Sequence, residues 1–175
     1  MPEIAKKICL VGDFSVGKTS LIRRFVEDKF SDDYLSTVGV KISRKSILLS
    51  SEQEYQKLNL IIWDVEGHTK FKSITTNYIT GASGSIIVGD VTRKETLDRI
   101  KTHLELFLKI NPQGFAIVAL NKSDLIASEK LQKLASLYNF DNHPQVVKTY
   151  TTSARTGVYV NQIFEVLGLK ILEFN

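Results

Sequence analysis

The sequence has little of what marks secreted, membrane-spanning or nucleic-acid-binding proteins. Its 175 residues include a single cysteine, Cys9, which excludes a disulfide framework and favours a reducing compartment. No apolar run approaches the roughly 20 residues that a membrane-spanning helix needs, and strand residues expected from Ile4 leave no room for a signal peptide. The net charge of +4 is modest, and the basic residues are dispersed rather than gathered into a patch. We therefore expect a cytoplasmic protein that binds no nucleic acid.

The chain does have the hydrophobic content of a folded domain. Apolar residues make up 43% of the sequence, which is enough for one domain over residues 1–175 with a sizeable core. Apolar runs alternate along the chain with segments of helical periodicity. These patterns predict strands near 4–11, 40–50, 57–64, 84–90, 115–121 and 146–151, and helices near 18–28, 70–79, 94–110, 127–138 and 159–173.

This alternation predicts an α/β fold. Strands that are almost continuously apolar, with helices between them, are typical of a largely parallel sheet that is covered on both faces. We expect three layers, with a six-stranded, mostly parallel sheet and about five helices. The exception is an antiparallel hairpin that turns through residues 50–54. Ligand-binding loops should gather at the carboxyl ends of the strands.

A phosphate-binding loop follows the first predicted strand. Residues 12–19 read Gly-Asp-Phe-Ser-Val-Gly-Lys-Thr, the Gly-x-x-x-x-Gly-Lys-Ser/Thr pattern between a strand and a helix. Gly12 and Gly17 let the backbone amides turn inward around a β-phosphate. Lys18 can reach the β- and γ-phosphates, and the Thr19 hydroxyl can bind Mg²⁺. We therefore predict a nucleoside triphosphate site. Its predicted contacts in this segment are Asp13, Phe14, Ser15, Val16, Gly17, Lys18, Thr19 and Ser20.

A second motif indicates which base is bound. The run Asn-Lys-Ser-Asp at 121–124 follows another apolar strand. The Asp124 carboxylate can accept hydrogen bonds from guanine N1–H and N2–H₂, a donor pair that adenine lacks. The loop at 152–155, after the last predicted strand, can offer backbone N–H groups to the guanine oxygen. The base is predicted to be guanine, with contacts from Asn121, Lys122, Asp124, Ser153, Ala154 and Arg155.

The segments between these motifs supply further candidates. Asp64, at the end of a buried strand, can hold Mg²⁺ through water, and the Gly67 N–H can bond the γ-phosphate. Thr37 can add a hydroxyl to the metal, Phe30 can lie across the base, and Tyr34 is in the same nucleotide-facing loop. Each has a structural alternative: Thr37 a surface hydroxyl, Phe30 a core ring and Asp64 a helix cap. Their order and spacing favour the binding site.

These motifs resemble those of the Ras superfamily of small GTPases, most of all its Rab-like branch. The resemblance extends over essentially the whole chain. The residues that carry it lie at 12–13, 16–19, 36–40, 63–64, 78, 81–84, 90–92, 121–124 and 152–154. The family fold is the P-loop NTPase fold of small G proteins, in agreement with the alternation of strands and helices.

The resemblance implies a molecular switch. Such a protein binds GTP or GDP with Mg²⁺, hydrolyses GTP slowly, and meets effectors, an exchange factor and an activating protein through its switch regions. These regions correspond here to residues near 30–42 and 64–78. The residues implied in hydrolysis are Lys18, Thr37, Gly67 and His68, and the implied metal ligands are Thr19, Thr37 and Asp64.

Three residues depart from the usual family pattern. Where relatives have a Gln that orients the attacking water, this chain has His68, whose imidazole can also hydrogen-bond a water. Phe14 replaces a small residue of the phosphate loop and can crowd the γ-phosphate and an incoming arginine finger. Glu66 adds a carboxylate near a polyanion, where like charge is costly. We expect weak intrinsic hydrolysis, with neutral variation in these loops as the alternative interpretation.

The departures leave a second function open: a nucleotide-dependent interaction module that binds GTP with little or no hydrolysis. A phosphotransferase such as a nucleoside kinase would instead need an acceptor-binding lid with several Arg. The sequence contains no such cluster, and the guanine-type run at 121–124 argues against this class.

The carboxyl end differs from that of membrane-acting relatives, which usually carry a long tail with prenylated cysteines. Here the last predicted helix lies just before Asn175, and no cysteine follows it. The chain is either trimmed to its domain or an unlipidated relative. We expect no direct membrane anchor in this chain, and any recruitment to membranes through a partner or a missing tail.

Overall fold

The computed structural model describes residues 3–33, 39–50, 54–65, 67 and 72–174. In helix α2 (Lys72–Ile79), side chains are described only from Thr76 onward.

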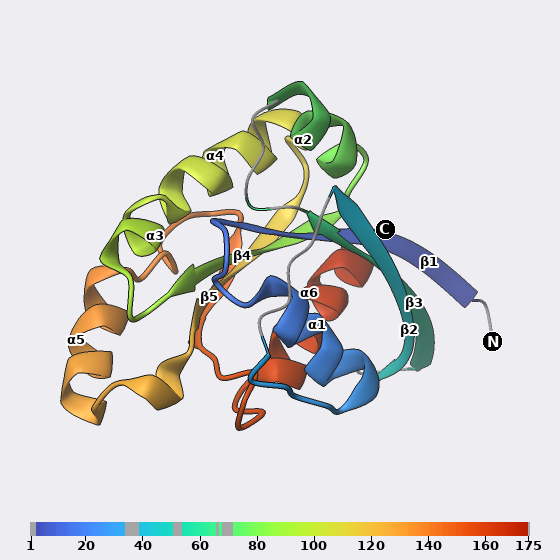
Figure 1. Cartoon of the computed structure of the whole chain (residues 1–175). Coiled ribbons are helices and arrows are strands. Elements are labelled where there is room, and N and C mark those ends of the chain that lie inside the picture. The colour runs from blue at the N-terminus through green and yellow to red at the C-terminus, as the bar shows by residue number, and fades with distance from the viewer. Residues whose placement is uncertain (1–2, 34–38, 51–53, 66, 68–71, 175) are drawn as a thin grey trace.

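The centre of the molecule is one six-stranded sheet (Figure 1). Its spatial order is β2-β3-β1-β4-β5-β6, and every neighbouring pair is parallel except β2 and β3, which are antiparallel. The predicted α/β fold with its single hairpin is therefore confirmed. The strands are β1 (Glu3–Gly12), β2 (Val40–Ser50), β3 (Tyr55–Val65), β4 (Gly84–Asp90), β5 (Phe115–Asn121) and β6 (Val146–Thr151).

The helices also follow the predicted segments, with one interruption. The segment expected as a single helix over 94–110 forms two helices that meet at Arg99. Residues 123–125 form a short 3-10 helix, η1. The α-helices are α1 (Lys18–Glu27), α2 (Lys72–Ile79), α3 (Lys94–Asp98), α4 (Ile100–Ile110), α5 (Ser128–Leu137) and α6 (Val160–Glu173).

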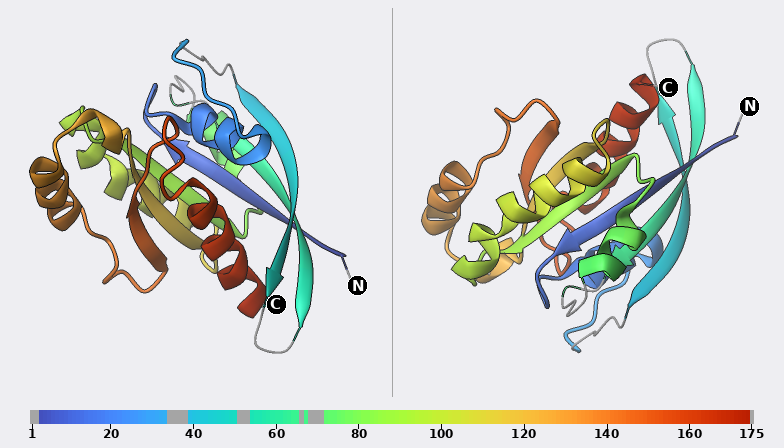
Figure 2. Two further views of the ribbon diagram at one scale, coloured as in Figure 1. Left: turned by 90° about the horizontal axis from the view of Figure 1, so that it is seen from below. Right: turned by 90° about the horizontal axis from the view of Figure 1, so that it is seen from above.

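Helices cover both faces of the sheet (Figure 2). Helices α1 and α6 lie on one face, where Phe25 and Phe164 stack with ring centroids 4.0 Å apart. Helices α3 and α4 pack on the other face through residues such as Leu97 and Phe107. Side chains alternate between the faces of a strand. Ile8 of β1 therefore packs in the core beneath α1 and α6, and Cys9 packs in the core beneath α3 and α4. Both faces are buried, which explains the continuous apolar runs.

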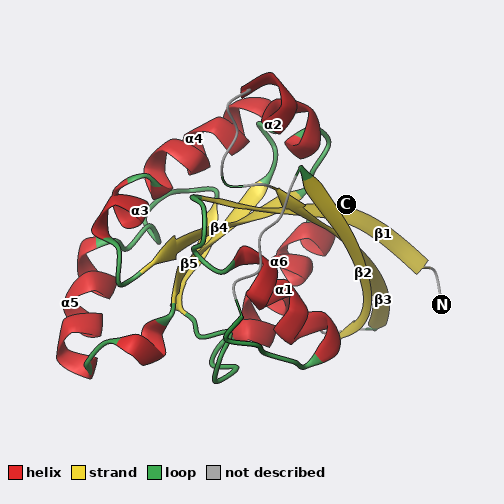
Figure 3. Ribbon diagram, viewed as in Figure 1, coloured by secondary structure: helices red, strands yellow, loops and turns green. Residues whose placement is uncertain are grey.

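The parallel strands bring the predicted motifs to one edge of the sheet. In the pairing register, Leu10 of β1 lies opposite Asp64 of β3. Asp90 of β4 lies opposite Asn121 of β5, and Leu120 pairs with Thr151 of β6. The loops that leave these carboxyl ends are drawn in green in Figure 3, between the strands in yellow and the helices in red. Segments far apart in the sequence therefore become neighbours at this edge, the usual ligand-binding position in such folds.

Candidate functional site

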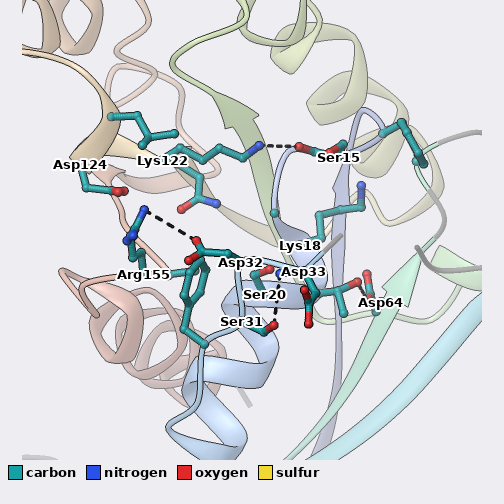
Figure 4. Close-up of a pocket in the computed structure, with 18 of the residues that line it drawn as sticks. Ser15, Lys18, Ser20, Ser31, Asp32, Asp33, Asp64, Lys122, Asp124 and Arg155 are labelled. Carbon is teal, nitrogen blue, oxygen red and sulfur yellow. Dashed lines mark hydrogen bonds and ion pairs between the residues drawn. The ribbon is translucent and has the colours of Figure 1, made fainter. Parts of the chain in front are cut away.

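A cleft of about 330 Å³ opens at the carboxyl edge of the sheet (Figure 4). It is lined by the predicted phosphate-binding loop at 12–19 (the phosphate-type loop), the start of α1, the end of β3 and the loops after β5 and β6. The predicted site residues that line it are Phe14, Ser15, Gly17, Lys18, Thr19, Ser20, Phe30, Asp64, Gly67, Asn121, Lys122, Asp124, Ala154 and Arg155.

Three other predicted contact residues do not line this cleft. Val16 is fully buried in the core, and Asp13 and Ser153 are almost fully buried behind the cleft wall. Their side chains are therefore not exposed at the cleft surface. Tyr34, Thr37 and His68, together with Glu66, lie outside the described residues.

The backbone of the phosphate-type loop is shaped by Ser15 and Gly17. Both have positive φ, 60° for Ser15 and 101° for Gly17, a region that glycine enters without steric cost. A Cβ at Gly17 would also lie 2.3 Å from the Asn121 side-chain nitrogen, so the position has no room for a larger residue. This loop leads straight into α1, whose first turn has no acidic residue and no side-chain cap. Its amides remain available to an anion.

Lys18 is held at the centre of this loop. Its ammonium donates to the Gly12 carbonyl at 3.0 Å and to the Asp13 carbonyl at 2.8 Å. Only 7% of the residue is exposed, and this desolvation lowers the pKa of Lys18 to about 8, while the charges of Asp64 and Asp13 oppose the shift. The ammonium lines the cleft as a buried cation, which an added phosphate would stabilise.

Thr19 and Asp64 form the candidate metal site. The Thr19 hydroxyl donates to Asp64 Oδ2 at 2.5 Å, and Asp64 is 1% exposed. Both residues line the cleft. Hydroxyl and carboxylate oxygens are ligand types that suit Mg²⁺, a hard cation that also keeps several waters. The donor set therefore fits the predicted metal.

At the other end of the cleft, Asn121 and Lys122 connect two loops. Asn121 donates to the Val16 carbonyl at 3.0 Å and accepts from Thr152 at 3.0 Å. Lys122 donates to the Ser15 carbonyl at 2.9 Å, as Figure 4 shows. It also pairs at 2.9 Å with Asp90, which is fully buried. These two residues therefore tie the phosphate-type loop to the loop that carries the predicted base contacts.

Asp124 is oriented by Ser153. The Ser153 hydroxyl donates to Asp124 Oδ1 at 2.8 Å, which leaves the other carboxylate oxygen for a ligand. The backbone N–H of Ser153 is already bonded to the Val158 carbonyl at 3.2 Å. Of the amides expected to meet a guanine oxygen, that of Ser153 is thus taken up within the protein, whereas Ala154 and Arg155 line the cleft.

Arg24 is a supporting residue that the sequence motifs did not reveal. From α1 it donates to the Ala154 carbonyl at 2.8 Å and also to the Arg155 carbonyl. It fixes the loop after β6 against the helix that starts at the phosphate-type loop. An Arg on a helical face carries no sequence signal for this role, because its partners lie far away in the chain.

Phe30 makes the core contact that its sequence position allowed, and its contact with a base stays a prediction. The ring packs against the core on the α1 side and also lines the cleft. Beside it, Asp32 pairs with Arg155 across the cleft at 3.6 Å (Figure 4). The lining residues that sequence reasoning missed are Ser31, Asp32, Asp33, Val65 and Leu125. The polar loop residues at 31–33 have no spacing signal that distinguishes them from ordinary surface positions, and Val65 and Leu125 are apolar residues that belong to no motif.

Gly67 packs directly against the phosphate-type loop. A Cβ at this position would lie 2.5 Å from the Phe14 nitrogen and 2.6 Å from the Asp13 carbonyl carbon. Only glycine permits this close approach. The start of the predicted second switch region therefore rests on the peptide between Asp13 and Phe14.

Comparisons with known proteins agree with this geometry. The model of the Ras family matches residues 7–173. Ras-related protein Rab-13 of Canis lupus familiaris is 34% identical over 167 residues, which cover 95% of this chain and 79% of that protein. Ras-related protein Rab-22A of Homo sapiens is 31% identical, covering 94% of this chain and 82% of that protein. Ras-related protein RabC of Dictyostelium discoideum is 33% identical over 171 residues, covering 94% and 83%.

Within the described part of the chain, no helix is both long and apolar enough to cross a bilayer. The match of the family model over nearly the whole chain, with relatives above 30% identity, shows the family. The chain belongs to the Ras family and is a Rab-like member of the Ras superfamily of small GTPases.

Proposed function

We propose that this protein is a guanine-nucleotide switch that binds GTP and GDP with Mg²⁺ and hydrolyses GTP slowly. The observation that carries the proposal is the convergence of three sets of groups in one cleft: the Lys18 ammonium, the oxygens of Thr19 and Asp64, and the Asp124 carboxylate. These suit, respectively, phosphates, a hard divalent cation and the guanine edge.

The phosphates would be held by Lys18 together with the amides of the loop and of the first turn of α1. The ammonium and the amides are already in place in the folded chain. Binding therefore requires little rearrangement of this end of the site, which favours affinity. Mg²⁺ would be held by Thr19 and Asp64, and when bound it neutralises charge on the phosphate oxygens. Thr37 would join this set in the triphosphate state.

Guanine would be selected by Asp124. The carboxylate accepts from Ser153 through one oxygen and can accept from guanine N1–H and N2–H₂. Adenine would leave the same carboxylate without donors, which makes adenine nucleotides poor ligands. Asn121 and Lys122 support the base loop, and Phe30 borders the same cleft.

Hydrolysis would depend on Gly67, Thr37 and His68 to position the γ-phosphate and the attacking water. An arginine finger from an activating protein typically accelerates such reactions by about 10³- to 10⁵-fold. We propose that activating proteins, exchange factors and effectors meet the chain through residues near 30–42 and 64–78. We also propose that residues 1–175 form one GTPase domain, with a cytoplasmic location and recruitment to membranes through a partner or through a tail outside this sequence.

Binding measurements test the proposal directly. Fluorescent GDP and GTP analogues should bind the purified chain with Mg²⁺, whereas the matching ADP and ATP analogues should not. Lys18→Ala should lose most of the binding, and Lys130→Ala, which removes an exposed lysine of α5, should bind as the wild type does. Equal affinity for guanine and adenine nucleotides would refute the assignment.

A second candidate function is a nucleotide-dependent interaction module that barely hydrolyses GTP. The observation that favours it is the Phe14 ring, which lines the same cleft as Lys18. Single-turnover hydrolysis by wild type, Phe14→Gly, His68→Gln and the double variant separates the two functions. Wild-type turnover on the order of 1 s⁻¹ would eliminate hindered hydrolysis. A slow rate that neither substitution changes would direct attention to Glu66.

A further inference from the structure

Asp13 has an unusual position for a residue of a phosphate-binding loop. It is 7% exposed and does not line the cleft. Its carboxylate is paired with Arg99, at the junction of α3 and α4, and lies 2.8 Å from His103 Nε2 of α4. An ionised carboxylate this deeply buried needs such partners, because burial without them is costly.

The main chain of Asp13 connects this pair to the phosphate end of the cleft. Its carbonyl accepts from the Lys18 ammonium at 2.8 Å. Gly67 rests on the peptide that joins Asp13 to Phe14. The Phe14 carbonyl, in turn, accepts from Arg93 at 2.8 Å. One short stretch of backbone thus touches the phosphate-binding lysine, the start of the second switch region and two arginines of the α3–α4 segment.

The charge of the Asp13 carboxylate would act on a bound nucleotide. A negative carboxylate this close to Lys18 would repel the phosphates of a bound nucleotide, and its charge is felt at Lys18. The guanidinium of Arg99 offsets that charge, and the His103 contact adds a second hydrogen-bonding partner. Without these partners, the site would hold an uncompensated anion and a phosphate-type loop that is less restrained.

We propose that Arg99 and His103 form a clamp on Asp13 that slows the release of bound nucleotide. In this clamp, Asp13 is a positioning residue: it acts on Lys18 through its main chain and through its charge. The inference rests on the proposed nucleotide-binding function and deepens it, because it assigns control of nucleotide release to side chains outside the cleft. Neither Arg99 nor His103 lines the cleft itself.

The test is the dissociation rate of a fluorescent GDP analogue, chased with excess GDP, for wild type, Arg99→Ala and His103→Ala. We expect each variant to release the analogue about fivefold faster, a size that allows for the partial exposure of both side chains. Arg99→Lys and His103→Gln, which keep a donor, should recover part of the slow release. Lys101→Ala is the matched control, because it removes an exposed cation of α4 that pairs with Glu105 on the same helix.

A double-mutant cycle separates a clamp on Asp13 from a general disturbance of α4. In the Asp13→Asn background the repulsive charge is absent, so Arg99→Ala should add little to the release rate. The proposal is overturned if Arg99→Ala matches Lys101→Ala, or if its effect is the same in the Asp13→Asn background. Thermal unfolding of each variant shows that it is folded at the temperature of the assay.

The outcomes also keep this inference distinct from the proposed function. If the wild type retains the GDP analogue and the clamp variants release it at the wild-type rate, the clamp alone fails. If the wild type does not retain the analogue, the guanine-nucleotide assignment fails, and control of nucleotide release by Asp13 is refuted with it.

Discussion

At the proposed phosphate end of the cleft the lining comes mainly from one continuous segment, the loop and first turn at 14–20. The proposed base end instead combines two loops, at 121–125 and 154–155. The first is shaped by its own backbone, with positive φ at Ser15 and Gly17. The second depends on contacts between distant segments, such as Ser153 with Asp124. A local motif can build an anion site by itself, but selecting a base requires the fold to bring two loops together.

The two ends are nevertheless joined. Asn121 and Lys122 belong to the base end and donate to the carbonyls of Val16 and Ser15 at the phosphate end. A substitution that breaks these hydrogen bonds should therefore affect both ends of the cleft. Changes that spare the links should affect only one end.

The largest effect is expected for Asp124→Asn. The variant loses the paired acceptor for guanine, so GDP affinity should fall by about a hundredfold or more. Xanthine nucleotides, whose N1–C2 edge suits a donor, should bind better than they bind the wild type. Competition titrations with GDP and XDP measure both changes. Unchanged GDP affinity would show that the base end does not select guanine.

Thr19→Asn should change the preference at the phosphate end without affecting the base end. Thr19 is expected to hold Mg²⁺ in both nucleotide states, with Thr37 joining when a γ-phosphate is present. The variant should therefore favour GDP over GTP by about tenfold, while its preference for guanine over adenine stays. A competition assay between GDP and GTP measures the ratio. Equal loss of both nucleotides would contradict this division of roles.

The pH dependence of GDP binding should report the protonation of Lys18. Burial lowers the pKa of its ammonium to about 8 in the chain without ligand. Below that pH the charged group meets phosphate directly, but above it the neutral amine must first take up a proton, so affinity falls as pH rises. We expect a loss of about tenfold between about pH 7 and about pH 9 at constant Mg²⁺. Lys18→Arg, which stays charged, should remove this loss of affinity. A wild-type affinity that does not change with pH would contradict the prediction.

The smallest effect is expected for Ser153→Ala, which removes the hydroxyl that orients Asp124. GDP affinity should fall by about fivefold, the size of one hydrogen bond to a charged group that water can partly replace. Thr156→Ala, at an exposed position nearby in the same loop, is the control. Titration of GDP and ADP analogues gives affinity and base preference together. A larger loss than that of Asp124→Asn would mean that Ser153 supports the whole loop.

Much of this molecule follows from local patterns. The apolar runs and helical periodicities predict all six strands and five helical segments, because strands such as β4 and β5 are buried on both faces and helices such as α4 and α6 on one. The loop at 12–19 was recognisable for a similar reason: its glycines, lysine and hydroxyl are adjacent in the chain. Among the described residues, the elements depart from the prediction at Arg99, where the predicted helix is divided into α3 and α4, and at 123–125, where a short 3-10 helix forms.

What the sequence by itself determined was therefore the class of fold and the positions of the predicted binding loops, since both depend on neighbours along the chain. The tertiary structure alone decided how those loops are held. The support of Ala154 by Arg24 and the pairing of Asp13 with Arg99 and His103 join residues that only the packed sheet and helices bring together. Such pairs have no fixed spacing, because their geometry is set by how strands and helices pack rather than by distance along the chain.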